Sequence, residues 1–176
     1  MGTRHMIGII SGGQYRVAQY GQWDGYVKGG QGESILKFLC THDISVLKNK
    51  LDNCRFIDKD ELRQMYVNAG DKPNNTSGFI EFSVELKMNE MYPSLSRDTG
   101  AKILDIIYDS TGEVPLIDNK SFLDDGLFCE YAYVINFDEN ALICYKNGRN
   151  EVVRYNLNEL PTIDKMEEDV DGPSNE

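Results

Sequence analysis

Met6-Ile-Gly-Ile-Ile-Ser-Gly-Gly-Gln-Tyr-Arg-Val-Ala-Gln-Tyr20 is the stretch from which the fold can be worked out. Two runs rich in β-branched and aromatic residues, 6–10 and 15–20, flank Ser11-Gly12-Gly13-Gln14. A Gly-Gly pair supplies the positive φ angles that a tight hairpin turn demands. The second run alternates two sets of side chains, so its strand should have two different faces. The chain is therefore predicted to begin with a β-hairpin.

A glycine-rich segment follows this hairpin directly. Gly21-Gln-Trp-Asp-Gly-Tyr26 contains the single tryptophan of the chain, and Gly29-Gly-Gln-Gly32 comes soon after. A strand end that leads into a loop is a common position for binding residues. Aromatic rings with polar edges, next to amide side chains, suit recognition of a flat polar molecule. Because the glycines match no phosphate-binding pattern, we interpret the segment as a recognition surface.

Helical spacing of apolar residues dominates the middle of the chain. Asp43, Asp58 and Ser96 are suitable N-caps, and Gly70 is a suitable stop. The N-terminus of the first helix would offer free backbone N–H groups to an anion around residues 30–34, unless the glycines there are only a flexible entry. The sequence predicts helices over residues 33–41, 43–54, 58–69 and 96–108.

Strand patterns make up most of the remainder. Phe82, Val84 and Leu86 alternate with polar residues, and Asp138-Glu-Asn140 is typical of a hairpin turn. Strands are predicted over residues 79–86, 127–137, 141–145 and 152–155. The order of strands, helices and strands again predicts an α+β fold, in which antiparallel hairpins form one sheet or two and pack with helices.

One domain with a short tail is expected. Residues 1–163 fit a single α+β domain of ordinary size. Residues 164–176 contain six acids against the single Lys165, few apolar residues and Gly172-Pro173. Such a composition does not bury enough apolar surface to fold, so we predict an acidic disordered tail.

Composition excludes several classes of protein. A net charge of −11 argues against broad nucleic-acid binding. No run of about 20 apolar residues is present to span a membrane, and no secretory signal precedes the domain. The cysteines, at positions 40, 54, 129 and 144, form no CxxC pair. They are predicted to be reduced and structural, in a cytoplasmic protein.

Charged residues from other blocks would complete a ligand site at the glycine-rich segment. Arg4 and Arg97 would neutralise an anionic ligand, Trp23 would stack on its ring, and Gln22 and Asp24 would select its polar edges. The predicted ligand-binding residues are Arg4, Gln19, Tyr20, Gln22, Trp23, Asp24, Tyr26, Arg97, Asp98 and Glu130.

Catalytic and metal-binding alternatives are weaker. Asp24, Asp98 and Glu130 could meet as a carboxylate cluster for Mg²⁺ or acid–base chemistry, but pairing with Arg4 and Arg97 or capping of turns is favoured. A thiol nucleophile at Cys129, with His5 or His42 as its base, is disfavoured by its apolar strand context. Zinc ligands usually come in tighter pairs than this sequence offers. No catalytic residue, metal or cofactor is therefore assigned.

Four blocks carry a resemblance to a protein family. They are Gly2-Thr-Arg-His5, Val17-Ala-Gln-Tyr-Gly-Gln-Trp-Asp-Gly25, Leu95-Ser-Arg-Asp-Thr-Gly100 and Phe128-Cys-Glu-Tyr-Ala-Tyr-Val134. They resemble an uncharacterised family of bacterial, phage and fungal proteins that begin with GTR and carry a VAQYGQWDG segment. The resemblance covers most of the chain in short blocks and implies no established activity.

A fainter similarity links residues 16–22 to HslV-like peptidases, which are N-terminal-nucleophile (Ntn) hydrolases. It implies an αββα sandwich and an N-terminal threonine nucleophile. Such an enzyme uses the α-amino group of its own nucleophile as the base. Removal of Met1 would expose Gly2 rather than Thr3, which puts catalysis by Thr3 in doubt.

The leading hypothesis is a soluble protein that binds a small nucleotide-like or other planar anionic ligand without catalysis. The phage resemblance implies sequestration of a defence signal in the host-cell cytoplasm. One alternative is an Ntn-type amide hydrolase, and another is an acidic protein that inhibits a protein partner. So small a chain also suits a pocket shared by two copies, which would make it a homo-oligomer.

Overall fold

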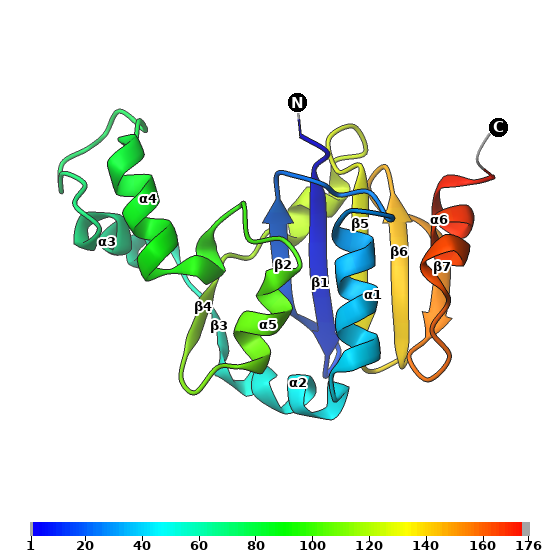
Figure 1. Cartoon of the computed structure of the whole chain (residues 1–176). Coiled ribbons are helices and arrows are strands. Elements are labelled where there is room, and N and C mark those ends of the chain that lie inside the picture. The colour runs from blue at the N-terminus through cyan, green and yellow to red at the C-terminus, as the bar shows by residue number, and fades with distance from the viewer. Residues whose placement is uncertain (1, 174–176) are drawn as a thin grey trace.

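The computed structural model describes residues 2–173, and a five-stranded mixed sheet forms its centre (Figure 1). The first hairpin joins β1 (His5–Ser11) to antiparallel β2 (Gln14–Gly21). Gly12 and Gly13 adopt φ angles of 66° and 76° in its turn, which glycine reaches without the steric cost of a Cβ. The predicted N-terminal hairpin is confirmed.

The C-terminal strands complete the same sheet. The predicted second hairpin forms between β5 (Tyr131–Asn136) and β6 (Ala141–Lys146), and β7 (Asn150–Asn156) pairs with β6 at the edge. β5 also lies parallel to β1, with Ile7 opposite Tyr133, which gives the strand order β2-β1-β5-β6-β7. The α+β class is therefore correct.

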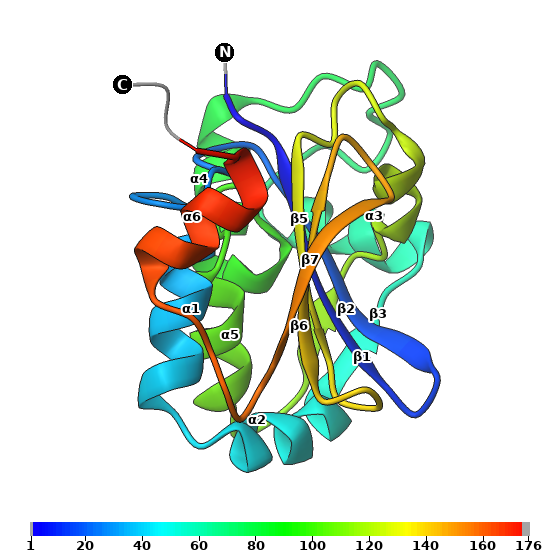
Figure 2. The same ribbon diagram turned by 90° about the vertical axis from the view of Figure 1, so that its right-hand side faces the viewer.

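The two faces of the sheet are covered differently. Helices α1 (Gln31–Thr41), α5 (Lys102–Tyr108) and α6 (Ile163–Asp171) lie on one face (Figure 2). Ile7 and Ile9 point toward this helical layer and form the main core with its apolar side chains. Met6 and Ala18 point to the other face, which Leu123 covers from the 3₁₀ helix η3 (Lys120–Asp124). Period-2 alternation along the strands places these two sets on opposite faces.

A helical arm stands beside the sheet. α2 (Ile44–Lys50) and the 3₁₀ turn η1 (Leu51–Asn53) lead to a small parallel pair, β3 (Cys54–Phe56) with β4 (Val114–Leu116). Beyond β3 the chain forms α3 (Lys59–Asn68), α4 (Phe82–Met91) and η2 (Pro93–Leu95) (Figure 1). Ala69, Val84 and Met88 form a separate apolar cluster there. We call residues 59–91 the arm.

Two sequence predictions are wrong in this part of the chain. The sequence predicts a strand over residues 79–86, but residues 82–91 form α4. Val84 and Met88 are four residues apart and bury the same helix face against α3. The helix predicted over 96–108 begins at Lys102. Ser96 caps no helix, since its hydroxyl accepts the backbone N–H of Asp98 within a turn.

The predicted disordered tail is also wrong for residues 164–171, which belong to α6. The Thr162 side chain caps this helix, and Met166 and Val170 are buried within the main core. Residues 174–176 of the tail lie outside the described residues. The residues that are described form one large sheet and one two-stranded sheet, so the Ntn-type αββα sandwich is not confirmed.

Candidate functional site

Blocks that are far apart in the sequence meet where β2 ends and β1 begins, at the top of Figure 1. The chain that leaves β2 crosses the start of β1, where the Gly25 N–H donates to the Thr3 carbonyl at 2.9 Å. The buried Tyr133 hydroxyl of β5 donates to the Gly25 carbonyl at 2.7 Å. Gly25 therefore joins the β1, β2 and β5 segments at this end of the sheet.

The loop of residues 96–98 is held against the end of β2 by three hydrogen bonds. The buried Gln19 side chain donates Nε2–H to the Ser96 carbonyl at 3.1 Å. The Gln22 backbone N–H donates to the Arg97 carbonyl at 3.0 Å, and the Trp23 indole N–H donates to Asp98 Oδ1 at 2.8 Å. Three consecutive residues are thus fixed from one strand end.

Gln31 ties the glycine-rich segment to the start of α5. Its Oε1 accepts the Ala101 backbone N–H at 2.7 Å, and its Nε2–H donates to the Trp23 carbonyl at 3.3 Å. Gly100, with a φ angle of 54°, packs against this amide, and a Cβ there would overlap it. The contact explains why a glycine follows the Arg97 loop.

The first turn of α1 is not an anion site. The Gln31 N–H donates to the Asp24 carbonyl at 2.8 Å, and the Glu33 N–H donates to the Val27 carbonyl at 2.8 Å. The Gly32 N–H donates to the Tyr26 carbonyl at 3.3 Å. An anion would need these N–H groups to be free, but backbone carbonyls already accept all three of them. The expectation of an anion at residues 30–34 is therefore wrong.

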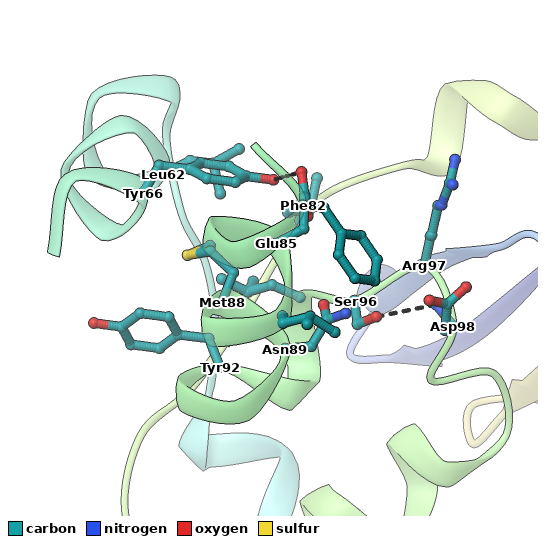
Figure 3. Close-up of a pocket in the computed structure, with 13 residues that line it drawn as sticks. Leu62, Tyr66, Phe82, Glu85, Met88, Asn89, Tyr92, Ser96, Arg97 and Asp98 are labelled. Carbon is teal, nitrogen blue, oxygen red and sulfur yellow. Dashed lines mark hydrogen bonds between the residues drawn. The ribbon is translucent and has the colours of Figure 1, made fainter. Parts of the chain in front are cut away.

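A cavity of about 440 Å³ lies between the arm and the loop of residues 96–98 (Figure 3). Figure 3 shows Phe82, Asn89 and Arg97 on one side of α4, and Tyr66, Met88 and Tyr92 on the side toward α3. The cavity is lined by Leu62, Tyr66, Phe82, Glu85, Leu86, Met88, Asn89, Tyr92, Leu95, Ser96, Arg97, Asp98 and Ile117.

The charged groups of the cavity differ in how many hydrogen-bond or ion-pair partners they have. Asp98 accepts the Trp23 indole N–H, and Glu85 Oε1 accepts the Tyr66 hydroxyl at a long 3.4 Å. The exposed Arg97 guanidinium has no hydrogen-bond or ion-pair partner within residues 2–173. A cation without a partner, on a fixed backbone, is prepared to receive an anion.

Comparison with protein-family models, with curated protein sequences and with solved structures finds no match for this chain. The resemblance of the four sequence blocks to the GTR-type family therefore stays a prediction.

The predicted ligand-binding residues fall into three groups. Arg97 and Asp98 line the cavity. Gln19, Gln22 and Trp23 hold the loop that carries those two residues. The remaining five contact one another or neighbouring residues without lining the cavity, and they are Arg4, Tyr20, Asp24, Tyr26 and Glu130.

The residues of this last group have partners of their own. The Arg4 guanidinium lies over the Phe128 ring, 4.8 Å from its centroid, while the Arg4 backbone N–H donates to Glu130 at 2.9 Å. The Tyr26 hydroxyl donates to Asp24 at 3.0 Å. Tyr20 packs edge-on against Phe122.

The predicted carboxylate pairs do not form. Asp24, Asp98 and Glu130 accept hydrogen bonds from a tyrosine, a tryptophan and a backbone N–H, and within residues 2–173 no arginine side chain pairs with them. No group of three or more His, Cys, Asp or Glu residues that could hold a metal ion is found in the part of the chain that is described. Within the same part, no helix is long and apolar enough to cross a membrane.

The cysteines are free thiols, as predicted. Both Cys129, just before β5, and Cys144, within β6, are buried. Burial raises the pKa of Cys129 to about 11 and that of Cys144 to about 12, because a thiolate is poorly solvated there. Both thiols stay protonated at neutral pH, which removes the nucleophile that a thiol hydrolase at Cys129 would need.

His5, one of the two candidate bases for a thiol nucleophile, is a buried titratable group at the start of β1. Its side chain is 1% exposed, and neither ring nitrogen has a hydrogen-bond partner among the described residues. Burial lowers its pKa to about 4, although the nearby Asp24 charge acts in the opposite direction. The strand prediction for residues 79–86 leaves out the cavity residues of α4. The four-residue spacing of Phe82 and Leu86, both of which line the cavity, is the helical signal in the sequence.

Proposed function

We propose that the protein binds a small planar ligand with an anionic group in the cavity between α4 and the loop of residues 96–98, without chemical conversion. The observation that carries this proposal is the position of Arg97. Its guanidinium has no partner among residues 2–173, while its backbone is held by β2. The held backbone keeps the guanidinium beside the cavity, and its free N–H groups can hold an anion through two parallel hydrogen bonds.

The apolar lining supports a ring-shaped ligand. Phe82 and Leu86 lie on one face of α4 and are 76% and 53% exposed. Large side chains exposed together at a cavity are typical of binding surfaces. Asn89 adds an amide that can donate to and accept from a ring edge. Small-ligand sites commonly combine an apolar lining with a few polar groups in this way.

Sequestration is the biological form of this proposal. It rests on the sequence resemblance to a family with phage members, and it requires tight binding and slow release. The bound molecule would then be a nucleotide-like defence signal, held in the cytoplasm of an infected host. Binding could involve one copy of the chain or two.

A ligand titration tests the proposal. AMP, ADP-ribose and cyclic dinucleotides are added to the whole protein while Trp23 fluorescence and the melting temperature are followed. Trp23 is hydrogen-bonded to a cavity residue, so occupancy should change its emission. We expect at least one probe to raise the melting temperature, as a ligand specific for the native state must.

Two arginine variants provide the comparison. Arg97→Met should lose the response, while Arg149→Met should keep it, because Arg149 pairs with Asp124 and does not line the cavity. The absence of any response from all probes, or an equal response in Arg97→Met, would contradict the proposal.

A further inference from the structure

We infer that the ligand of this cavity is a nucleoside monophosphate whose base carries an exocyclic amino group. The inference rests on the proposed function and narrows its ligand class. It follows from the charges that line the cavity: one cation, Arg97, and two carboxylates, Glu85 and Asp98. A planar ligand would therefore meet both a site for an anion and a site for N–H donors.

The single cation limits the anionic part of the ligand. Arg97 is the one Lys or Arg residue among the lining residues. A guanidinium can hold one phosphate through two parallel N–H···O bonds. Each further phosphate would add negative charge beside Glu85 and Asp98, on a chain with a net charge of −11. Like charges at short range repel, so a triphosphate is disfavoured relative to a monophosphate.

Glu85 on α4 defines the other end of the ligand, while Asp98 lies beside Arg97 (Figure 3). Trp23 donates to Asp98 Oδ1, and Tyr66 donates to Glu85 Oε1. The other oxygens, Asp98 Oδ2 and Glu85 Oε2, accept no hydrogen bond from residues 2–173. Ionised carboxylates only accept hydrogen bonds. An amino group on a base supplies the N–H donors they lack, whereas a carbonyl at the same position would place two acceptors against each other.

The arrangement of the side chains fits a base and a phosphate together. In Figure 3, the Phe82 ring lies on the side of α4 toward Arg97, and the Glu85 carboxylate of the same helix reaches the Tyr66 hydroxyl. A base can stack on the Phe82 ring with its edge toward Glu85 and its phosphate toward Arg97. The cavity volume of about 440 Å³ lies in the lower part of the usual range for ligand sites. This size favours one nucleotide over two joined nucleotides.

Calorimetric titration of the whole protein with matched nucleotides tests the inference. The probes are AMP, ATP, a cyclic dinucleotide of adenine, IMP and the monophosphate of purine riboside, which lacks the amino group. We expect AMP to bind about tenfold or more tightly than ATP or the cyclic dinucleotide, and about fivefold more tightly than the purine riboside form, with IMP weakest.

Variants of the lining residues show which side chain distinguishes AMP from IMP and which one holds the phosphate. Glu85→Gln keeps an oxygen for the Tyr66 hydroxyl and should reduce the preference for AMP over IMP. Glu90→Gln is the matched control on α4, because Glu90 is exposed and does not line the cavity. Arg97→Met should weaken AMP binding about tenfold or more.

The outcomes separate the two proposals. Equal or tighter binding of ATP, the cyclic dinucleotide or IMP would overturn the inference while the proposed function stands. An unchanged AMP-to-IMP preference in Glu85→Gln would also overturn it. If none of the nucleotides binds, in agreement with a negative fluorescence screen, the proposed function itself fails.

Discussion

Trp23 and Asp98 lie 75 residues apart in the sequence and are joined by a 2.8 Å hydrogen bond from the indole N–H to the carboxylate. The bond connects the end of the first hairpin to the loop that carries Arg97. It is exposed to solvent at both ends. Its main effect is therefore on the position of the loop, because an exposed hydrogen bond adds little to global stability.

The first prediction concerns this bond. Asp98→Ala should cost only about 0.5 kcal/mol of unfolding free energy but shift Trp23 emission, whereas Asp98→Asn should cost less because an amide oxygen still accepts. Denaturant unfolding of Asp98→Ala, Trp23→Phe and the double variant measures the coupling. Strict additivity of the two single variants would show that the bond is not formed in solution.

The second prediction is a pH dependence caused by His5. The unfolded side chain titrates near 6.5, and burial lowers the folded pKa to about 4. Between these values the unfolded state binds the extra proton. Stability is therefore complete above about pH 6.5 and falls as the pH drops toward 4, by roughly 3 kcal/mol in total.

Unfolding measurements across this pH window check the His5 effect. Carboxylates also titrate at the acidic end, so the informative quantity is the difference between the wild type and His5→Phe. His42→Asn is the matched control, because His42 is the other histidine of the chain and is only half-buried. Its Nε2 lies 3.7 Å from Asp105 Oδ1. Identical pH slopes for the wild type and His5→Phe would contradict the prediction.

The third prediction concerns Gly21, which leaves room for His5. A Cβ at Gly21 would overlap the imidazole ring of His5, its partner in the strand register. Gly21→Ala should therefore lower the unfolding free energy by about 1–3 kcal/mol through overpacking. Gly112→Ala is the control, because nothing lies within 4 Å of a Cβ there.

A double variant makes the Gly21 prediction specific. In His5→Ala/Gly21→Ala the added methyl group can occupy space that the imidazole leaves. The double variant should then be more stable than the sum of the two single effects implies. A simple sum would indicate that the cost of Gly21→Ala comes from the backbone alone.

The fourth prediction concerns the separate packing of the arm. Met88 is 4% exposed within the small apolar cluster of the arm, and Ile35 is fully buried in the main core. Met88→Ala should cost about 2–5 kcal/mol of the stability of the arm, and Ile35→Ala should cost a similar amount of global stability. By hydrogen exchange, Met88→Ala should release the amides of α3 and α4 while β1 and β5 stay protected. Equal loss of protection in the sheet would show that the arm and sheet unfold together.

Local patterns were enough to predict much of the fold. The two hairpins follow from period-2 alternation and from turn residues such as Gly12 and Gly13, whose φ angles depend only on neighbouring atoms. Asp58 begins α3 as its capping residue, paired with Glu61 in a capping box. These signals act over a few residues, so the sequence alone contains them.

Other elements depended on burial. Phe82, Val84 and Leu86 alternate as in a strand, yet contact with α3 stabilises a helix there. In α6, Met166 and Val170 stand among acids and become a core face only because the sheet lies beneath them. Tertiary packing outweighs weak local preference in such segments.

The sequence by itself determined the hairpins and the α+β class, and it indicated the blocks around Trp23 and Arg97 as candidate binding segments. Only the tertiary structure decided that Gln19 and Trp23 hold the Arg97 loop, and that α4 forms the opposite wall of the cavity. The physical reason is the separation along the chain over which each interaction acts. Backbone periodicity and turn geometry are local, whereas the meeting of residues 23 and 98 depends on how the sheet, the loop and the arm pack together.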